Sequence, residues 1–194
     1  MTIRIDVKAE VEAAQKNLDD LQKRQVRRAA ARALNRTGQQ VRTRAVRDTA
    51  KTMGLTGKRV REAITLFKAN PNALHAEVKA KGQPISLKEF KARQTRKGVT
   101  AKIMGERTLY RHRFMIQSLG GHVFEREGEK RLAKKGRYAG TNIKRQPIRK
   151  LWGPSVPAVF LMDNINKALR DHAGERWRLN FDRELQFYLN RINK

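Results

Sequence analysis

The chain has 194 residues, a formal net charge of +27 and no cysteine. Self-repulsion at this charge opposes compaction, so the composition indicates a partner of opposite sign: nucleic acid, an acidic protein surface or an anionic membrane. The absence of cysteine excludes disulfides, thiolate catalysis and cysteine-ligated zinc. Lys and Arg outnumber Asp and Glu by 10 in residues 1–70, by 15 in residues 71–150 and by 2 in residues 151–194, so the positive charge is concentrated.

Residues 2–7 alternate apolar and charged side chains, which is the period of a half-buried strand. Arg4 and Asp6 interrupt this segment, so it does not have the composition of a signal peptide. No apolar run is long enough to cross a bilayer. These features predict a soluble protein without a membrane partner.

Residues 8–52 contain no proline and one glycine, and their apolar residues recur every three or four positions, which predicts long helix. Arginine recurs on the opposite face of this helix. That face is either ordinary solvated helix surface or a surface that binds an acidic partner. As interaction residues we select four arginines at four-residue spacing: Arg24, Arg28, Arg32 and Arg36.

A second helix is predicted after a glycine-containing break at residues 53–57, with Thr56 as its cap and its end before Pro71. Three residues form its predicted apolar side: Val60, Ile64 and Phe67.

An antiparallel sheet is predicted in the middle of the chain, because several segments alternate apolar and polar residues. Pro147 confines the last of these strands to an edge or a bulge, since proline cannot donate a ladder hydrogen bond. The predicted strands are residues 74–81, 99–104, a pair within 113–124 around two glycines, and 145–152.

Two basic stretches, residues 88–102 and 126–150, are predicted to be loops, long hairpin arms or segments that become ordered only in an assembly. Their composition is not expected to build a core, so both should be mobile in an isolated subunit. Within the second arm we select four candidate interaction residues: Arg131, Lys134, Lys135 and Arg137.

The last 44 residues are predicted to form two helices. Ser155 caps the first, which buries Val159, Phe160, Ile165 and Leu169 and ends at Gly174. The second helix carries an aromatic stripe typical of core packing, which begins at Trp177 and Phe181 and continues through Leu185, Tyr188, Leu189 and Ile192. A rigid strand-to-helix corner is predicted just before these helices. We favour a turn that defines the fold over a direct role in binding. Its residues are Pro147, Gly153, Pro154, Ser155 and Pro157.

No constellation of catalytic residues is present, so the chain is not expected to be an enzyme or to hold a metal or cofactor. His122 with Glu125 and Glu127 comes closest, but charged residues near a strand end usually belong to the surface. Nucleic-acid binding agrees with the charge, although residues 126–150 contain a single aromatic residue, Tyr138, and the arginine face of the first helix contains none. Any contact with nucleic acid would therefore be made to phosphates without sequence preference.

Three segments carry a family resemblance: residues 121–128 (GHVFEREG), 146–148 (QPI) and 151–160 (LWGPSVPAVF). They resemble the minor tail protein Z family of long-tailed bacteriophages and prophages, whose members share an "hVF.R.g … PI..l.GPSVP..f" pattern. The N-terminal half is also similar, with an alanine-rich helix that ends in residues 33–36 (ALNR).

The resemblance implies a tail-completion protein at the head-proximal end of the tail, assembled in the bacterial host cytoplasm and needed for productive head–tail joining. It implies a ring of copies, six-fold by analogy, that contacts tail-tube, terminator and neck proteins, the tape-measure protein, and phage DNA without sequence preference. The alternative is a nucleic-acid-binding protein outside any virion.

The sequence therefore predicts an α+β fold with long N-terminal helices, a central antiparallel sheet with basic arms, and two C-terminal helices packed on the sheet. We predict a single domain with three parts: helices in residues 8–70, the sheet in 71–152 and the helical pair in 153–194.

Overall fold

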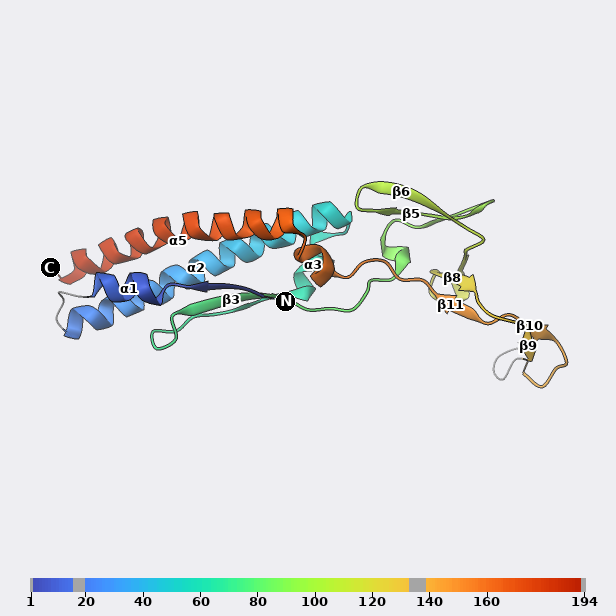
Figure 1. The fold of residues 1–194 in the computed structure, drawn as a ribbon, viewed down its shortest axis with the longest axis horizontal. Coiled ribbons are helices and arrows are strands. Elements are labelled where there is room, and N and C mark those ends of the chain that lie inside the picture. The colour runs from blue at the N-terminus through green and yellow to red at the C-terminus, as the bar shows by residue number, and fades with distance from the viewer. Residues whose placement is uncertain (1, 16–19, 133–138, 193–194) are drawn as a thin grey trace. The chain divides into compact units, whose positions relative to one another are not determined.

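The computed structural model describes residues 2–15, 20–132 and 139–192, which form an α+β fold of helices and small antiparallel sheets (Figure 1). The predicted fold class is confirmed. The chain divides into two compact units, of which the first comprises Met1–Lys51, Thr56–Gly82 and Val156–Lys194 and the second Thr52–Leu55 and Gln83–Ser155. Within the described residues, no helix is both long and apolar enough to span a membrane.

The first unit contains a three-stranded antiparallel sheet in the order β1 (Thr2–Asp6), β3 (His75–Ala80), β2 (Ile64–Phe67). Ile3 lies opposite Val78, and Val78 lies opposite Leu66, so these three side chains form one row on the same face. Ile3 and Val78 are buried. The alternation predicted for residues 2–7 and 74–81 is therefore confirmed, with one face turned to the core.

Two N-terminal helices follow β1: α1 (Lys8–Ala14) and α2 (Asp20–Met53), which has 34 residues. The sheet-facing side of α2 is rich in alanine, and at its centre stands Gly38. A Cβ atom at Gly38 would lie 2.7 Å from Leu66 Cδ1 and 3.7 Å from the Cβ of Ala76. The glycine therefore lets α2 approach the sheet closely, although glycine is a poor helix former.

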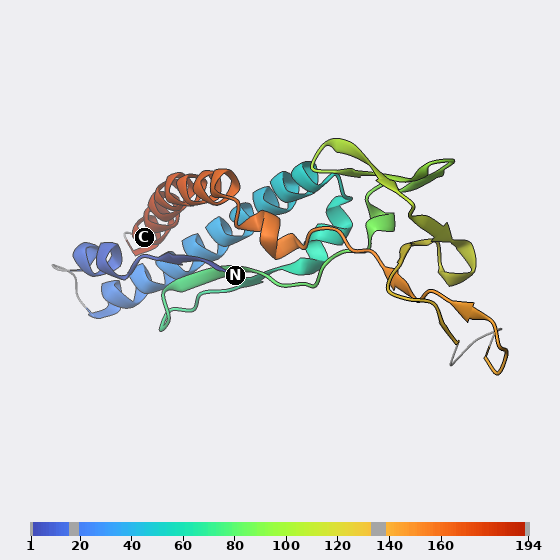
Figure 2. The same ribbon diagram turned by 45° about the vertical axis from the view of Figure 1, so that its right-hand side comes forward.

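The C-terminal helices are α4 (Val156–Phe160) and α5 (Asp163–Ile192), and α5 lies beside α2 on the same face of the sheet (Figures 1 and 2). The side-chain amide of Asn180, which is buried, donates to Thr37 Oγ1 at 3.0 Å and to Gln40 Oε1 at 3.1 Å. The indole N–H of Trp177 donates to Glu10 Oε2 at 2.8 Å. These bonds fix α5 against both N-terminal helices, since a buried polar group without a partner is costly.

The predicted helix after residue 56 is only partly correct. Helix α3 (Gly57–Ala63) follows Thr56, whose side chain makes no capping hydrogen bond, and the next four residues form β2 instead of continuing the helix. Arg42 Nε donates to the carbonyl oxygen of Ile64 at 2.9 Å, and the amide of Lys81 donates to that of Ala63 at 2.8 Å. The helix ends there because these bonds satisfy its terminal carbonyls.

The predicted boundary between the C-terminal helices is wrong. The first helix, α4, ends at Phe160, and α5 runs without interruption through Gly174. Gly174 does not end the helix because the α5 side chains on both sides of it are packed in the core: Leu169, Ala173 and Trp177 are all buried. Their burial outweighs a propensity cost of about 1 kcal/mol.

Replacing Gly174 with alanine is expected to stabilise the first unit by about 0.5–1 kcal/mol, because the new Cβ meets no atom within 4 Å and alanine is the better helix former. Urea unfolding of the variant measures this gain. Gly38→Ala is the matched control, since it makes the same change where the Cβ would collide with Leu66. An equal gain at both positions would contradict the packing role of Gly38.

The second unit contains the remaining strands in three small sheets. The first has the order β4 (Arg93–Thr95), β5 (Gly98–Ile103), β6 (Glu106–Arg111), and the second the order β11 (Ile148–Lys150), β8 (His122–Arg126), β7 (Phe114–Ile116). The third pairs β9 (Arg131–Leu132) with β10 (Lys144–Arg145). Two 3₁₀ turns, η1 (Leu87–Glu89) and η2 (Gln117–Leu119), lie between strands.

All the strand pairs in the described chain are antiparallel, as predicted, but they form four separate sheets and not one central sheet. The strands after residue 83 are short and pair mainly with their neighbours in sequence, so each hairpin closes its own small sheet. The single strand predicted for residues 145–152 is wrong, because Arg145 belongs to β10 and Pro147 lies between β10 and β11, but β11 is at the edge of its sheet, as the proline predicted.

The two basic stretches differ in structure. Residues 88–102 contribute Phe90, Val99 and Ala101 to the buried core, so the expectation that this stretch cannot build a core is wrong. Its apolar residues are few, but Val99 and Ala101 occupy alternate buried positions of β5 and Phe90 is buried directly after η1. In the arm of residues 126–150, the strands β9 and β10 are exposed throughout.

Candidate interaction surfaces

The arginine face predicted on α2 is divided between two environments. Arg24, Arg27 and Arg28 are exposed and line a groove of about 640 Å³ against the turn formed by residues 70–73. No acidic residue lines this groove among the described residues. Two of the four selected arginines thus lie where an acidic ligand could approach, and Arg27 joins them.

Arg32 makes contacts within the first unit. Its guanidinium lies 4.0 Å from Glu184 Oε2 and 5.9 Å from the centre of the Tyr188 ring, both on α5. These distances are typical of a weak surface ion pair and a cation–π contact. Arg36 is exposed on the same helix. The structure therefore does not bring the four selected arginines into one site.

Of the candidates in the second arm, Arg131 lies on β9, exposed and opposite Arg145 of β10. Lys134, Lys135 and Arg137 lie outside the described residues. Two apolar residues of this ribbon are also exposed: Leu132 of β9 retains 49% and Ile143, next to β10, 48% of its accessible surface. A two-stranded ribbon with exposed apolar and basic side chains has little to stabilise it within one chain.

The predicted corner is held by backbone hydrogen bonds. The amide of Gly153 donates to the carbonyl oxygen of Ile85 at 2.7 Å, and the amide of Glu127 donates to that of Pro147 at 2.9 Å. The carbonyl oxygen of Pro154 accepts a long bond of 3.5 Å from the amide of Ile85. Ser155 directly precedes α4, and Pro157 is the second residue of that helix, as predicted.

Gly153 is required at this corner for space. A Cβ atom there would lie 2.5 Å from Cε2 of the fully buried Phe90 ring. No side chain fits against a fixed aromatic ring at that distance. The corner is thus locked by packing as well as by hydrogen bonds.

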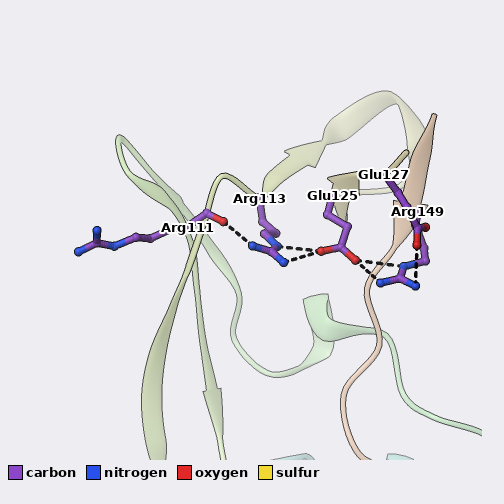
Figure 3. A network of polar contacts seen from close by, with 5 residues as sticks. All are labelled: Arg111, Arg113, Glu125, Glu127 and Arg149. Carbon is purple, nitrogen blue, oxygen red and sulfur yellow. Dashed lines mark hydrogen bonds and ion pairs between the residues drawn. The ribbon is translucent and has the colours of Figure 1, made fainter. Parts of the chain in front are cut away.

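An ion-pair network ties together three separate segments of the second unit (Figure 3). Glu125, which is buried on β8, accepts two hydrogen bonds from Arg113 on one oxygen, at 2.6 and 3.0 Å, and two from Arg149 of β11 on the other, at 2.5 and 3.0 Å. Arg149 also contacts Glu127 at 3.1 Å. The hydrogen bonds from Arg149 and Arg113 lower the pKa of Glu125, so this carboxylate stays ionised.

The same pairing engages both carboxylate oxygens of Glu125. Each of its oxygens is occupied by a bidentate guanidinium, so no oxygen is left to bind a substrate proton. His122 has different partners, and no hydrogen bond joins it to Glu125 in the part of the chain that the structure describes. The grouping of His122, Glu125 and Glu127 is structural.

His122 is held in its neutral form. Its Nε2 lies 3.2 Å from Lys150 Nζ, which can only donate, so the proton resides on Nδ1, 2.8 Å from Ser86 Oγ. Burial lowers the pKa of His122, and the nearby charges of Lys150 and Lys88 lower it further.

A loss of stability on acidification is expected from this histidine. Because its pKa is lower in the folded chain than the ordinary value of 6.5, its contribution is complete above pH 6.5 and is lost as the pH falls through the folded pKa. Thermal unfolding at pH 7.5 and 5.5 measures the loss. His122→Gln, which keeps a hydrogen-bonding side chain but does not titrate, should show a smaller difference between the two pH values; an unchanged difference would contradict the assignment.

No group of three or more metal-ligating side chains is found among the described residues. A family model described as prophage minor tail protein Z (GPZ) matches residues 8–194, which is nearly the whole chain. No curated protein and no solved structure matches it. The family is one of structural components of bacteriophage tails, so this protein is a minor tail protein of the virion. The chain belongs to the prophage minor tail protein Z family.

Proposed function

We propose that this minor tail protein completes the tail at its head-proximal end and is needed for productive joining of the tail to the DNA-filled head. The observation that carries the proposal is the basic arm of residues 126–150. Its strands β9 and β10 have only two residues each and are exposed, and two apolar side chains there, Leu132 of β9 and Ile143 next to β10, are about half exposed. Such a ribbon gains stability when another surface covers it.

A ring of copies of this chain supplies the surface that covers each arm. In a closed ring, each arm covers the next subunit and every arm is satisfied, which a heterologous interface allows. We propose a six-fold ring in contact with tail-tube, terminator and neck proteins, and with the tape-measure protein. The exposed groove of Arg24, Arg27 and Arg28 fits an acidic surface on one of these neighbours.

Complementation of a phage that lacks the gene tests this role. Leu132→Ser/Ile143→Ser should leave the described fold intact, since both side chains are exposed, while lowering the infectious yield by on the order of 100-fold or more because the arm loses its apolar contacts. Leu179→Ser is the matched control: this residue of α5 is 61% exposed and lies in the first unit. Full yield from the arm variant would overturn the proposal that the arm is an assembly contact.

The alternative function is sequence-independent binding of nucleic acid outside a virion. The net charge of +27 favours it, as does the absence of acidic residues from the described lining of the Arg24–Arg27–Arg28 groove. Genome neighbourhood separates the two functions: tail-tube, terminator and tape-measure genes beside this one support the tail, and their absence favours the alternative.

A further inference from the structure

A second basic cleft lies between α2 and α5 in the first unit, where the two helices run side by side (Figure 2). It encloses about 440 Å³ and was not among the sites selected from the sequence. Three arginines line it, Arg44 and Arg47 from α2 and Arg176 from α5, together with His172.

The cleft carries an excess of positive charge. Asp48 is the only carboxylate in its described lining, and it already pairs with Arg44, whose Nε lies 3.4 Å from Asp48 Oδ2. Arg47 and Arg176 are exposed, and no ion pair involving either one is recorded within the described ranges. Two guanidinium groups are therefore available to an anion, and the terminal nitrogens of Arg44 can add to them.

The neighbouring polar side chains are oriented by their own hydrogen bonds. Gln40 Oε1 accepts from Asn180, so the amide nitrogen of Gln40 is the end that can donate to a ligand. The hydroxyl of Thr43 donates to the carbonyl oxygen of Gln39 at 2.9 Å and so adds no donor. The donors of the cleft are thus one amide and the arginines.

His172 of α5 lines the same cleft. Burial lowers the pKa of His172, and Arg44 and Arg176 lower it further, while Glu175 and Asp48 oppose this effect. The exposed Arg47 also faces the cleft. An anion bound between the arginines would offset their charge, and the pKa of His172 would rise.

The lining favours phosphate over a protein segment. Every residue that lines the cleft in the described chain is polar or charged, so it offers no pocket for the apolar anchors on which protein interfaces depend. Arginine and glutamine side chains are common ligands of nucleic-acid phosphates, and such interfaces are more polar and more positively charged than those between proteins.

We propose that this cleft binds phosphate groups of a nucleic-acid backbone without sequence preference, with Arg47 and Arg176 as the principal ligands and Gln40 as a supporting donor. The site is independent of the tail-completion role, because it uses neither the arm residues nor the residues of the Arg24–Arg27–Arg28 groove.

Proton NMR of the four histidines in the full-length protein tests the site, with inorganic phosphate and a short DNA duplex as separate probes. Both probes should raise the pKa of His172 and leave the chemical shifts of His75, which lies on β3, unchanged. His172→Gln identifies the resonance. A response to phosphate but not to the duplex would overturn the nucleic-acid assignment, and a response to neither would overturn the site.

Salt dependence of duplex binding provides the second test. For Arg47→Gln/Arg176→Gln, the slope of log K against log salt should become shallower by about 1.8, since each lost phosphate contact removes about 0.9. The helices should persist because glutamine is a good helix former. Arg178→Gln/Arg183→Gln removes the same charge from exposed positions of α5 outside the cleft and should leave the His172 response intact. An equal loss of that response in both variants would contradict a local site.

Discussion

Replacing Glu125 with glutamine is expected to loosen the second unit and lower its melting temperature by several degrees. The carboxylate on β8 accepts two hydrogen bonds from each of Arg113 and Arg149, and neutral glutamine, with a single acceptor oxygen, cannot keep all four (Figure 3). Glu125 is the buried member of both pairs, whereas the side chains of Arg113 and Arg149 remain 37% and 60% exposed, so the cost arises from the lost charge-assisted hydrogen bonds of the carboxylate. Hydrogen exchange at residues 122–126 and 148–150 measures the effect locally.

The matched control is Glu127→Gln. Glu127 contacts the same Arg149 at 3.1 Å, but both side chains are more than half exposed, so solvent screens the pair and the melting temperature should change by less than about 1 °C. Acidification should imitate the Glu125 variant. Because the pKa of Glu125 is below its ordinary value of 4.5, its contribution is present above pH 4.5 and is lost as the pH falls through the folded pKa. Equal effects of the two variants would contradict the central position of Glu125.

Replacing Gly153 with alanine is expected to destabilise the second unit by about 1–3 kcal/mol, since the new Cβ would overlap the ring of Phe90. The cost arises from packing and not from backbone conformation. The double variant Gly153→Ala/Phe90→Leu replaces the ring with a smaller side chain. Its loss in the free energy of unfolding should therefore be less than the sum of the losses in the two single variants. Urea unfolding of the unmodified protein, the two single variants and the double variant measures this difference. If the losses in unfolding free energy are strictly additive, the Phe90 ring is not what excludes a side chain at residue 153.

Much of the fold could be predicted where sequence period and local bonding agree. The strands β1 and β3 alternate cleanly, and α2 combines helix-forming residues with a continuous small apolar stripe. In contrast, residues 60, 64 and 67 have helical spacing, yet Ile64–Phe67 forms β2 because β3 offers a ladder and Arg42 caps the end of α3. These are tertiary contacts that no local pattern reports.

The candidate sites were less predictable for the same reason. The arginines of α2 look alike in sequence, but Arg42 bonds to the backbone of Ile64 and Arg32 contacts α5, while Arg24 and Arg28 line an open groove. Separations of 12 and 24 residues divide Glu125 from its two arginines. Only the register of β7, β8 and β11 brings them together. The resemblance carried by residues 121–128, 146–148 and 151–160 did identify the family, because it rests on a residue pattern and needs no knowledge of tertiary contacts.

Mass spectrometry of tails purified without DNA and washed at high salt tests the tail-completion proposal most directly. Contacts between protein subunits combine apolar burial with charge pairs, so salt screens only part of their stability, whereas contacts with phosphates weaken steeply. We predict that the protein remains in the washed tails at a fixed copy number consistent with a ring. Loss of the protein at the salt concentration that abolishes DNA binding by the free subunit would contradict the proposal and favour the nucleic-acid alternative.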